Sequence, residues 1–592
     1  MPSEFRAYIY IKERLVELSW NTENPDRAGD VYTQHEALKN PLIKKYLVRD
    51  VPENIVVVRQ NKFMVIEAKG SQKKLQQAVD EAKAYADKLN KDRVLCPIAI
   101  AVAGNPEEKY RTKNFYFKDG KWHEIIVNDK IIGGLPSKDI AQQLVDNNIE
   151  RIDDLHISDD ILYGKATKIN EILHIGSINK NDRARIMAAL LLAMADDTPI
   201  NTDASSASVL TGEINAKVEK ILSDHGKKDF APRIIITPPT TPDNHVKFKQ
   251  ALVNTIQELE DLNIRSALNS GTDVLGRFYE VFLKYGNGAK EIGIVLTPRH
   301  ITTFAANAVR VNKHDKVFDP ACGTGGFLVA AFDRVRKTCN DAELDKFKTG
   351  GIYGIDQDAD VLALALVNMI FRGDGKNNIV EGNSLADKNF KDITMTKILM
   401  NPPFALKKED EKEYKFVDYA LEKTESGGLL FAIVPSPIMF RANNYKRWRE
   451  NLLTDHTLKA VIKLPEDLFY PVGVHASAIV VEAQVPHDFA KPVLWARLDD
   501  GFRKKKGVRK EVVSAPNNME AILSKVHAVL DGHSFSDKPK EWILAPILKD
   551  RYLECAPEQY LNDEEYSEAE VSDSMKRVLL NATGSLMTRN VL

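Results

Sequence analysis

Cysteine is scarce in this 592-residue chain, and the few cysteines stand far apart. Their positions form none of the close spacings that a metal site requires. The four cysteines are Cys96, Cys322, Cys339 and Cys555. So few and so scattered thiols are typical of a protein of the reducing cytoplasm.

The chain also lacks a long apolar run and a large net charge. Its longest apolar stretch, Ile186–Met194, is too short to cross a bilayer, and the N-terminus has no signal-peptide pattern. We therefore expect an intracellular, cytoplasmic protein that makes no membrane contact. The formal charge of −2 means that contact with nucleic acid would need local basic patches or a partner. The length predicts about three or four domains.

A glycine-rich turn is the strongest local feature of the sequence. Val317–Leu328 reads VFDPACGTGGFL, in which an apolar run ends at Asp319 and an apolar helix begins near Phe327. Glycine accepts positive φ and has no Cβ, so a ligand can lie directly against such a turn. Strand, glycine turn and helix form the nucleotide pocket of doubly wound α/β domains, where the helix N-terminus attracts negative charge.

Two further segments complete this pattern. Gly351–Asp356 is predicted to be a second strand that ends in an acid, where a ribose is usually bound. The strand Ile398–Met400 then runs into Asn401-Pro402-Pro403-Phe404, whose prolines end the strand and stiffen the loop. The asparagine amide and a backbone carbonyl can accept hydrogen bonds from an exocyclic amine, and the phenylalanine can stack on a planar base.

These motifs together resemble the adenine-N6 DNA methyltransferases, in particular the modification subunits of type I restriction systems. The resemblance runs from about Asp273 to Leu498 and includes Asp273–Leu283, Leu296–Arg299 and the late segment Leu464–Val481. It implies a doubly wound seven-stranded domain, double-stranded DNA as substrate and S-adenosylmethionine as cofactor. The catalytic loop would be Asn401, Pro402, Pro403 and Phe404. The cofactor-binding residues would be Thr297, Asp319, Ala321, Gly323, Gly325, Gly326, Phe327, Asp356 and Asn383. Many family members have an aspartate in place of Asn383.

The N-terminal part carries a second group of charged residues. A helix is expected from Glu4 to about Ser19, and two apolar β-branched runs, Pro52–Val58 and Phe63–Lys69, are spaced as a hairpin. Glu53 opens the first strand, and Glu67 and Lys69 close the second on one face, since strand side chains alternate. Converging carboxylates can hold Mg²⁺, and a neighbouring lysine can stabilise a charged phosphate transition state.

With the helix Gln72–Leu89 and the strand Val94–Val102, this order resembles the PD-(D/E)XK nuclease fold. The resemblance implies an Mg²⁺-dependent nuclease with Glu53 and Glu67 as metal ligands and Lys69 as a catalytic residue. Glu53 replaces the usual aspartate. Gln77 and Tyr85 stand near the positions of a QxxxY motif with looser spacing, and Glu13 and Glu17 are both candidates for a further acid.

The expected domains are a nuclease-like domain over residues 1–130, a helical connector over 131–270, the methyltransferase over 271–510 and a helical C-terminal region over 511–592. Ser177–Ala195 is predicted to be a core helix and Ser223–Asn244 an exposed connection. The basic run Asp499–Lys510 is a candidate phosphate contact. The segment after it is too short for a target-recognition domain, so we expect Asn518–Leu530 and Arg551–Leu561 to dock a separate specificity subunit in a hetero-oligomer. Their apolar positions could equally pack within the chain.

The combination resembles fused restriction-modification subunits of the type IIB and type IIG kinds. It implies a site-specific adenine DNA methyltransferase that is also a type II site-specific deoxyribonuclease cutting unmodified DNA. One alternative is a modification-only subunit whose N-terminal domain binds DNA without cutting. Another is a protein or RNA methyltransferase, although the protein glutamine enzymes usually have tyrosine after the two prolines, where this chain has Phe404.

Overall fold

The structure is a computed structural model of the chain, and its contacts divide the chain into two units. The first unit comprises Met1–Leu296, Gly323–Gly325 and Asp358–Glu381, and the second comprises Thr297–Cys322, Gly326–Gln357 and Gly382–Leu592. The described residues are 3–48, 51–127, 130–152, 159–196, 198–241, 244–262, 278, 282, 296–375, 378–386, 389–404, 412–442, 444–469, 473–505, 508–512, 514–549 and 552–561.

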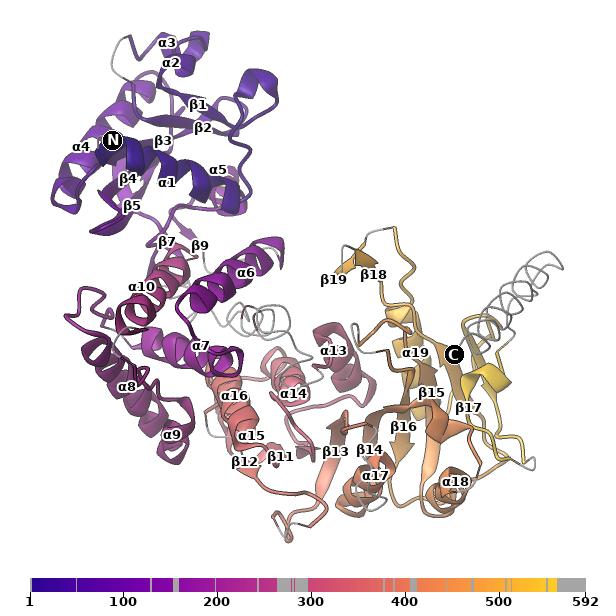
Figure 1. The fold of residues 1–592 in the computed structure, drawn as a ribbon. Helices are drawn as coiled ribbons and strands as arrows, with labels where there is room; N and C mark the ends of the chain where they lie inside the picture. The colour runs from indigo at the N-terminus through magenta and orange to yellow at the C-terminus, as the bar shows by residue number, and fades with distance from the viewer. Residues whose placement is uncertain are drawn as a thin grey trace, which may run out of the picture. The chain divides into compact units, whose positions relative to one another are not determined.

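In the first unit, the N-terminal residues form a mixed sheet in the order β1-β2-β3-β4-β5-β6 (Figure 1). Its elements are α1 (Ser3–Glu17), β1 (Val31–Thr33), β2 (Asn54–Arg59), β3 (Lys62–Lys69), α4 (Leu75–Leu89), β4 (Ile98–Asn105), β5 (Lys109–Lys118) and β6 (Lys121–Glu124). β3 and β4 are parallel and joined through α4, whereas the other neighbouring strands are antiparallel. The predicted helices and hairpin are confirmed. Sequence reasoning missed the three-residue β1 and began β4 too early at Val94, because Pro97 cannot donate to the ladder.

The two faces of this sheet belong to different cores. Met64 and Ile66 of β3 lie in the apolar cluster that includes α1, while Phe63 and Val65 lie in the cluster that includes α4. Glu67 alternates in step with Phe63 and Val65, so it lies on the α4 side of the sheet.

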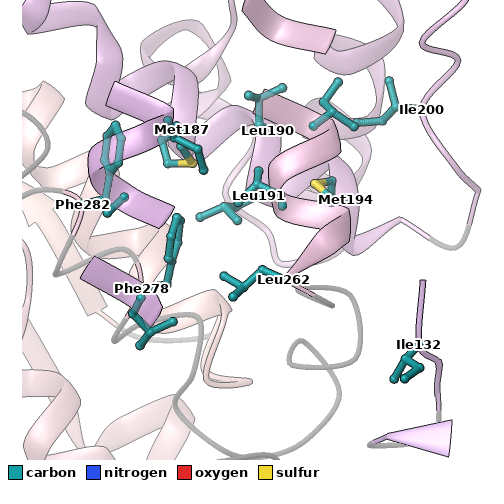
Figure 2. Packing of buried hydrophobic residues seen from close by; sticks show 14 of the residues in the cluster. Ile132, Met187, Leu190, Leu191, Met194, Ile200, Leu262, Phe278 and Phe282 are labelled. Carbon is teal, nitrogen blue, oxygen red and sulfur yellow. The ribbon is translucent and has the colours of Figure 1, made fainter. Parts of the chain in front are cut away.

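The rest of the first unit is mainly helical. Its elements are β7 (Ile126–Val127), β8 (Lys130–Ile131), α5 (Lys138–Asn147), β9 (Arg151–Ile152), α6 (Asp159–Ile175), α7 (Lys180–Ala195), α8 (Ala207–Asp224), α9 (Ala231–Ile234), α10 (His245–Asp261), α16 (Ala359–Ile370) and β12 (Asn378–Glu381). The predicted core helix Ser177–Ala195 is α7. Figure 2 shows its side chains in one buried cluster, which includes Met187, Leu190, Leu191, Met194, Leu262, Phe278 and Phe282. Apart from Phe278 and Phe282, the predicted motif Asp273–Leu283 lies outside the described residues.

The predicted exposed connection Ser223–Asn244 is wrong in part. It contains α9, and its apolar residues Ile234 and Ile236 are buried. The side chain of Asn215 on α8 makes both hydrogen bonds with the backbone of Ile236, at 2.9 Å to its carbonyl and 2.8 Å from its amide. This pairing satisfies the polar backbone and lets the segment pack inside.

The second unit is a doubly wound sheet in the order β11-β10-β13-β14-β16-β15-β17-β20. Its elements are α13 (Arg299–Ala308), β10 (Val317–Asp319), α14 (Gly326–Arg336), α15 (Asp341–Gly350), β11 (Ile352–Asp356), β13 (Met395–Met400), α17 (Glu413–Glu422), β14 (Thr424–Pro435), α18 (Asn444–Asp455), β15 (Thr457–Lys463), β16 (Ala476–Glu482), β17 (Val493–Arg497), β18 (Phe502–Lys505), β19 (Val508–Glu511), α19 (Met519–Leu530) and β20 (Trp542–Ala545). β10, β11, β13 and β14 run parallel, and β16 is antiparallel to both of its neighbours.

The C-terminal region differs from the helical tail that the sequence predicts. The helix expected at Asn518–Leu530 is α19, but β17 and β20 extend the sheet beyond β15. Ile522 and Val526 of α19 are buried within the described chain, and the guanidinium of Arg449 donates to the carbonyl of Leu553 at 2.8 Å. Part of the C-terminal region predicted to dock a specificity subunit is therefore packed against the rest of the described chain. Arg551 lies outside the described residues.

A buried ionic cluster joins α1 to α6 and α10. The guanidinium of Arg14 lies 2.5 Å from Glu258 and 2.9 Å from Asp261, and the ammonium of Lys165 lies 2.7 Å from both Glu258 and Glu17. The surrounding charges hold the pKa of Glu258 down, to about 2, against the burial that opposes ionisation. Removing one member would leave the others charged and buried.

We expect Arg14→Met to destabilise the first unit by about 3–5 kcal/mol, because it strands two buried carboxylates. The matched control is Arg59→Met, whose ion pair with Asp146 is exposed at both ends and should contribute less than about 1 kcal/mol. Thermal and urea unfolding of the full chain measures both. Equal destabilisation by the two variants would show that the buried cluster has no special role.

Candidate active sites

Neighbouring parallel strands of the second unit end at one edge of the sheet. β10 pairs in parallel with β11 on one side and with β13 on the other, and Asp319 lies opposite Gly354. Parallel neighbours bring their carboxyl ends to the same edge. Asp319, Asp356 and Asn401, which end or follow these strands, therefore lie at that edge.

The glycine turn follows β10. Asp319 is buried and accepts a hydrogen bond from the amide of Ala321 at 3.0 Å; burial raises the pKa of Asp319 well above its usual value, and the nearby charge of Asp356 adds to this shift. Gly323 and Gly325 have φ of 53° and 80°, a region that favours glycine. A Cβ at Gly323 would meet nothing within 4 Å, so there is open space beside this turn.

Helix α14 begins at Gly326 directly after the turn, as the sequence predicts. Phe327 is buried in this helix, so its ring lies in the core. A contact from Phe327 to a ligand would therefore use its backbone.

The segment after β12 adds a polar loop to this edge. The amide of Gly382 donates to the carbonyl of Asp356 at 2.9 Å, and the side chain of Asn383 accepts from the amide of Leu385 at 3.0 Å. The hydroxyl of Ser384 donates to the carbonyl of Pro320 and fastens the loop to the glycine turn. Sequence reasoning singled out Asn383 but missed the buried Ser384, because a serine in a loop carries no distinctive local signal.

Asn401 stands at the end of β13 with its two amide atoms in different surroundings. Its Nδ2 donates to Thr297 Oγ1 at 3.0 Å. Its Oδ1 is buried and has no hydrogen-bond partner within the described part of the chain. Structures rarely leave a buried acceptor unpaired, so such an atom needs an explanation, and a bound donor is one.

The rest of the predicted loop surrounds this acceptor. Pro402 is buried, Pro403 is exposed and Phe404 is half-buried. The ring of Phe404 meets Phe469 edge to face, with centroids 6.2 Å apart. The same loop thus carries an aromatic ring and a buried, unpaired carbonyl acceptor, and a planar amino-bearing ring could use both.

The basic run Asp499–Lys510, a candidate phosphate contact, contains most of the β18–β19 hairpin, and the structure pairs one of its cations with acidic side chains. Arg509 is buried and lies 2.6 Å from Asp500 and 2.9 Å from Asp467. It is therefore unable to contact phosphate in this conformation. Lys504 is exposed and remains a candidate for such a contact.

A separate charged cluster lies in the first unit, on the α4 side of β3. The ammonium of Lys69 lies 2.6 Å from Glu67 and 2.7 Å from Glu81 of α4. Burial raises the pKa of Glu67 to about 7 in spite of the opposing charge of Lys69. Gln77 donates to Glu81 at 2.9 Å. Sequence reasoning missed Glu81; its spacing of four residues from Gln77 on a helix was the available signal.

The other acidic residues predicted for the nuclease site lie in different places. The printed register, Asn54 opposite Ile66, places Glu53 across from Glu67 just before β2 begins. Glu17 instead lies in the ionic cluster of Arg14, and Glu13 is exposed on α1. In the described ranges, the structure places no group of three or more histidine, cysteine, aspartate or glutamate side chains that could hold a metal.

Among the described residues, no helix is long and apolar enough to cross a membrane.

The chain is similar to known DNA methyltransferases. The N-6 DNA Methylase family model matches residues 270–568, just over half of the chain. The type II restriction enzyme and methyltransferase RM.BcgI of Heyndrickxia coagulans is 41% identical over 241 residues, which are 39% of this chain and 38% of the relative. The type I restriction enzyme MjaIX methylase subunit of Methanocaldococcus jannaschii is 25% identical over 347 residues, 54% of this chain and 59% of the relative.

One solved structure has the same fold. It was described in work on the structural basis underlying complex assembly and conformational transition of the type I R-M system. It aligns with this chain with a TM-score of 0.51 and 18% sequence identity, and the alignment covers 73% of this chain and 98% of that one. The chain spans between 38% and 59% of the length of the two curated relatives above. Because the family model covers more than half of the residues, including the glycine turn and the Asn401 loop, the chain belongs to the N-6 DNA methylase family.

Proposed function

We propose that this chain transfers a methyl group from S-adenosylmethionine to the N6 amine of adenine in double-stranded DNA. The observation that carries the proposal is the buried, unpaired Oδ1 of Asn401, at the carboxyl end of β13, which pairs in parallel with β10. Adenine must leave the duplex to reach such an acceptor, so the base would be flipped out.

The residues at this edge fit the cofactor. Open space lies beside Gly323, where a Cβ would meet nothing within 4 Å, and the carboxylates of Asp319 and Asp356 can accept from ribose hydroxyls or an ammonium group. When bound, S-adenosylmethionine supplies an activated methyl group. The chain contributes orientation: Asn401 Oδ1 and the carbonyl of Pro402 would hold the amine, and Phe404 would stack on the base.

We expect Asn401→Ala to slow methyl transfer by about fivefold to 150-fold, because the loss of a buried hydrogen bond of this type costs about 1–3 kcal/mol. Cofactor affinity should stay at the parental value, since the amide contacts the base. Methylation of adenine and calorimetric titration of the cofactor measure the two effects. Methyl transfer at the parental rate by this variant would refute the assignment of the loop.

We also propose that the N-terminal part cleaves unmodified DNA with Mg²⁺, which would make the chain a fused restriction-modification subunit. The order of α1, the antiparallel β1–β2–β3, α4 and the parallel β4 supports the resemblance to PD-(D/E)XK nucleases. The relative RM.BcgI is named as both a restriction enzyme and a methyltransferase. Glu67 and Glu81 carry carboxylate oxygens of the kind that Mg²⁺ prefers, although the described side chains form no group of three that could hold a metal as they stand. In the modification-only alternative, the cluster of Glu67, Lys69 and Glu81 has only a structural role.

We expect Glu67→Ala to abolish Mg²⁺-dependent cleavage and leave methylation at the parental rate, because the two clusters lie in separate units. In the parent, cleavage should rise as the pH increases through about 7, since the raised pKa of Glu67 must be passed before its carboxylate can bind a cation. Glu107→Ala, an exposed glutamate between β4 and β5, is the control. Cleavage that persists in the Glu67 variant would show that this cluster is only structural, and a parent that does not cut DNA with Mg²⁺ would leave the modification-only alternative.

Sequence recognition is proposed to reside in a separate specificity subunit within a hetero-oligomer. Specific readout needs side chains that reach base edges in the major groove, and phosphate contacts from residues such as Lys504 give only salt-dependent, sequence-blind binding.

We therefore expect the chain alone to mark adenines without a shared motif, or to mark none. Sequencing that maps N6-methyladenine on mixed DNA distinguishes these results from specific marking. A single defined motif methylated without any partner would contradict the proposal and place recognition inside these residues.

A further inference from the structure

The amide of Asn401 has two ends with opposite chemistry, and its orientation decides whether it can serve the proposed reaction. With Oδ1 toward the base, the amide accepts a hydrogen bond from the adenine amine. Rotated by half a turn, it would present Nδ2 and two donated protons to an amine that itself donates. The rotated form is therefore unproductive.

In the structure, one contact holds the amide in the productive orientation. Asn401 Nδ2 donates to Thr297 Oγ1 at 3.0 Å, which leaves Oδ1 as the buried open end. The two residues are 104 positions apart in the sequence, so this contact is created only by the fold. A threonine hydroxyl has two lone pairs and can accept this bond throughout a reaction cycle.

Thr297 is itself held in place by the residues that follow it. Pro298 fixes its own backbone angle and precedes α13, and its carbonyl accepts from the amide of Ile301 at 2.9 Å. His300, the second residue of this helix, donates from Nε2 to Asp500 at 2.9 Å and stacks on Phe502 with centroids 4.2 Å apart.

Asp500 is in turn fixed by the buried Arg509, which donates to it at 2.6 and 2.8 Å. The opposite charge and the hydrogen bonds that it accepts from His300 and Arg509 hold the pKa of Asp500 well below its usual value, against its burial. The carboxylate therefore stays ionised at neutral pH, and its hydrogen bonds with His300 and Arg509 are kept. The segment from Thr297 to His300 is thus fastened to the start of the β18–β19 hairpin.

We propose, resting on the methyl-transfer function given above, that Thr297 is a positioning residue whose hydroxyl holds the Asn401 amide with Oδ1 toward the target amine. The His300–Asp500–Arg509 cluster keeps that hydroxyl at a fixed place. The loop is thereby oriented before the base arrives, and the cost of ordering it is removed from the reaction.

Three substitutions separate this role from a structural one. Thr297→Val keeps the shape of the side chain and removes the acceptor, and Thr297→Ser keeps the hydroxyl and removes the methyl group. Thr303→Val is the control, because Thr303 is an exposed threonine on the same helix α13. Each variant is compared with the parent in the active assembly, by single-turnover methyl transfer to DNA and by calorimetric titration of S-adenosylmethionine.

We expect Thr297→Val to slow single-turnover methyl transfer by about tenfold to a hundredfold when S-adenosylmethionine is saturating. Thr297→Ser should recover a rate within about threefold of the parent, and Thr303→Val should match it. A purely structural role would not distinguish valine from serine in this way.

Three results would overturn the proposal: a parental rate for Thr297→Val, a serine variant as slow as the valine variant, or a slow rate explained by weaker cofactor binding. The Asn401→Ala variant distinguishes a failure of the proposed loop function from a failure of the role proposed for Thr297. If that variant also transfers methyl groups at the parental rate, the proposed function of the loop is wrong. If it is slow while Thr297→Val is normal, only the role of Thr297 is wrong.

Discussion

The parallel pairing of β10 with both β11 and β13 is the constraint on which the candidate methyl-transfer site depends. It brings a buried acid, a second acid and an asparagine to one edge, although they are far apart in the sequence. The glycine turn then leaves open space beside the first strand. A shift in the register of β13 would move the Asn401 loop away from the turn while leaving every local motif intact.

Buried charge has a different role in each unit. In the first unit, the carboxylates of Glu258 and Asp261 are compensated by Arg14 and join three helices, a contact that stabilises the fold when complete. Glu67 is also buried, but its pKa is raised to about 7, so it is poised to exchange a proton or a cation near neutral pH. In the second unit, Asp500 stays ionised and serves as an anchor.

The structural features that the sequence predicted well are those that depend on a few contiguous residues. The glycine turn, the prolines after Asn401 and the β2–β3 hairpin each carry their own conformational signal within a few residues. Contacts between distant segments carry no such signal. The hydrogen bond from Asn401 to Thr297 and the approach of Glu81 to Lys69 were therefore missed. So was the burial of Arg509, which lies within a run predicted as a candidate phosphate contact. The extra strands β17 and β20 also depend on pairing that local patterns do not specify.

The most direct test of the account is the identity of the methylated atom. The protein, purified from its native cells with the polypeptides that accompany it, is incubated with DNA and S-adenosylmethionine carrying an isotopically labelled methyl group. The DNA is then digested to nucleosides and analysed by mass spectrometry. The account predicts that the label appears in N6-methyladenine. Label in a cytosine product, or in RNA or protein while the DNA stays unlabelled, would contradict it.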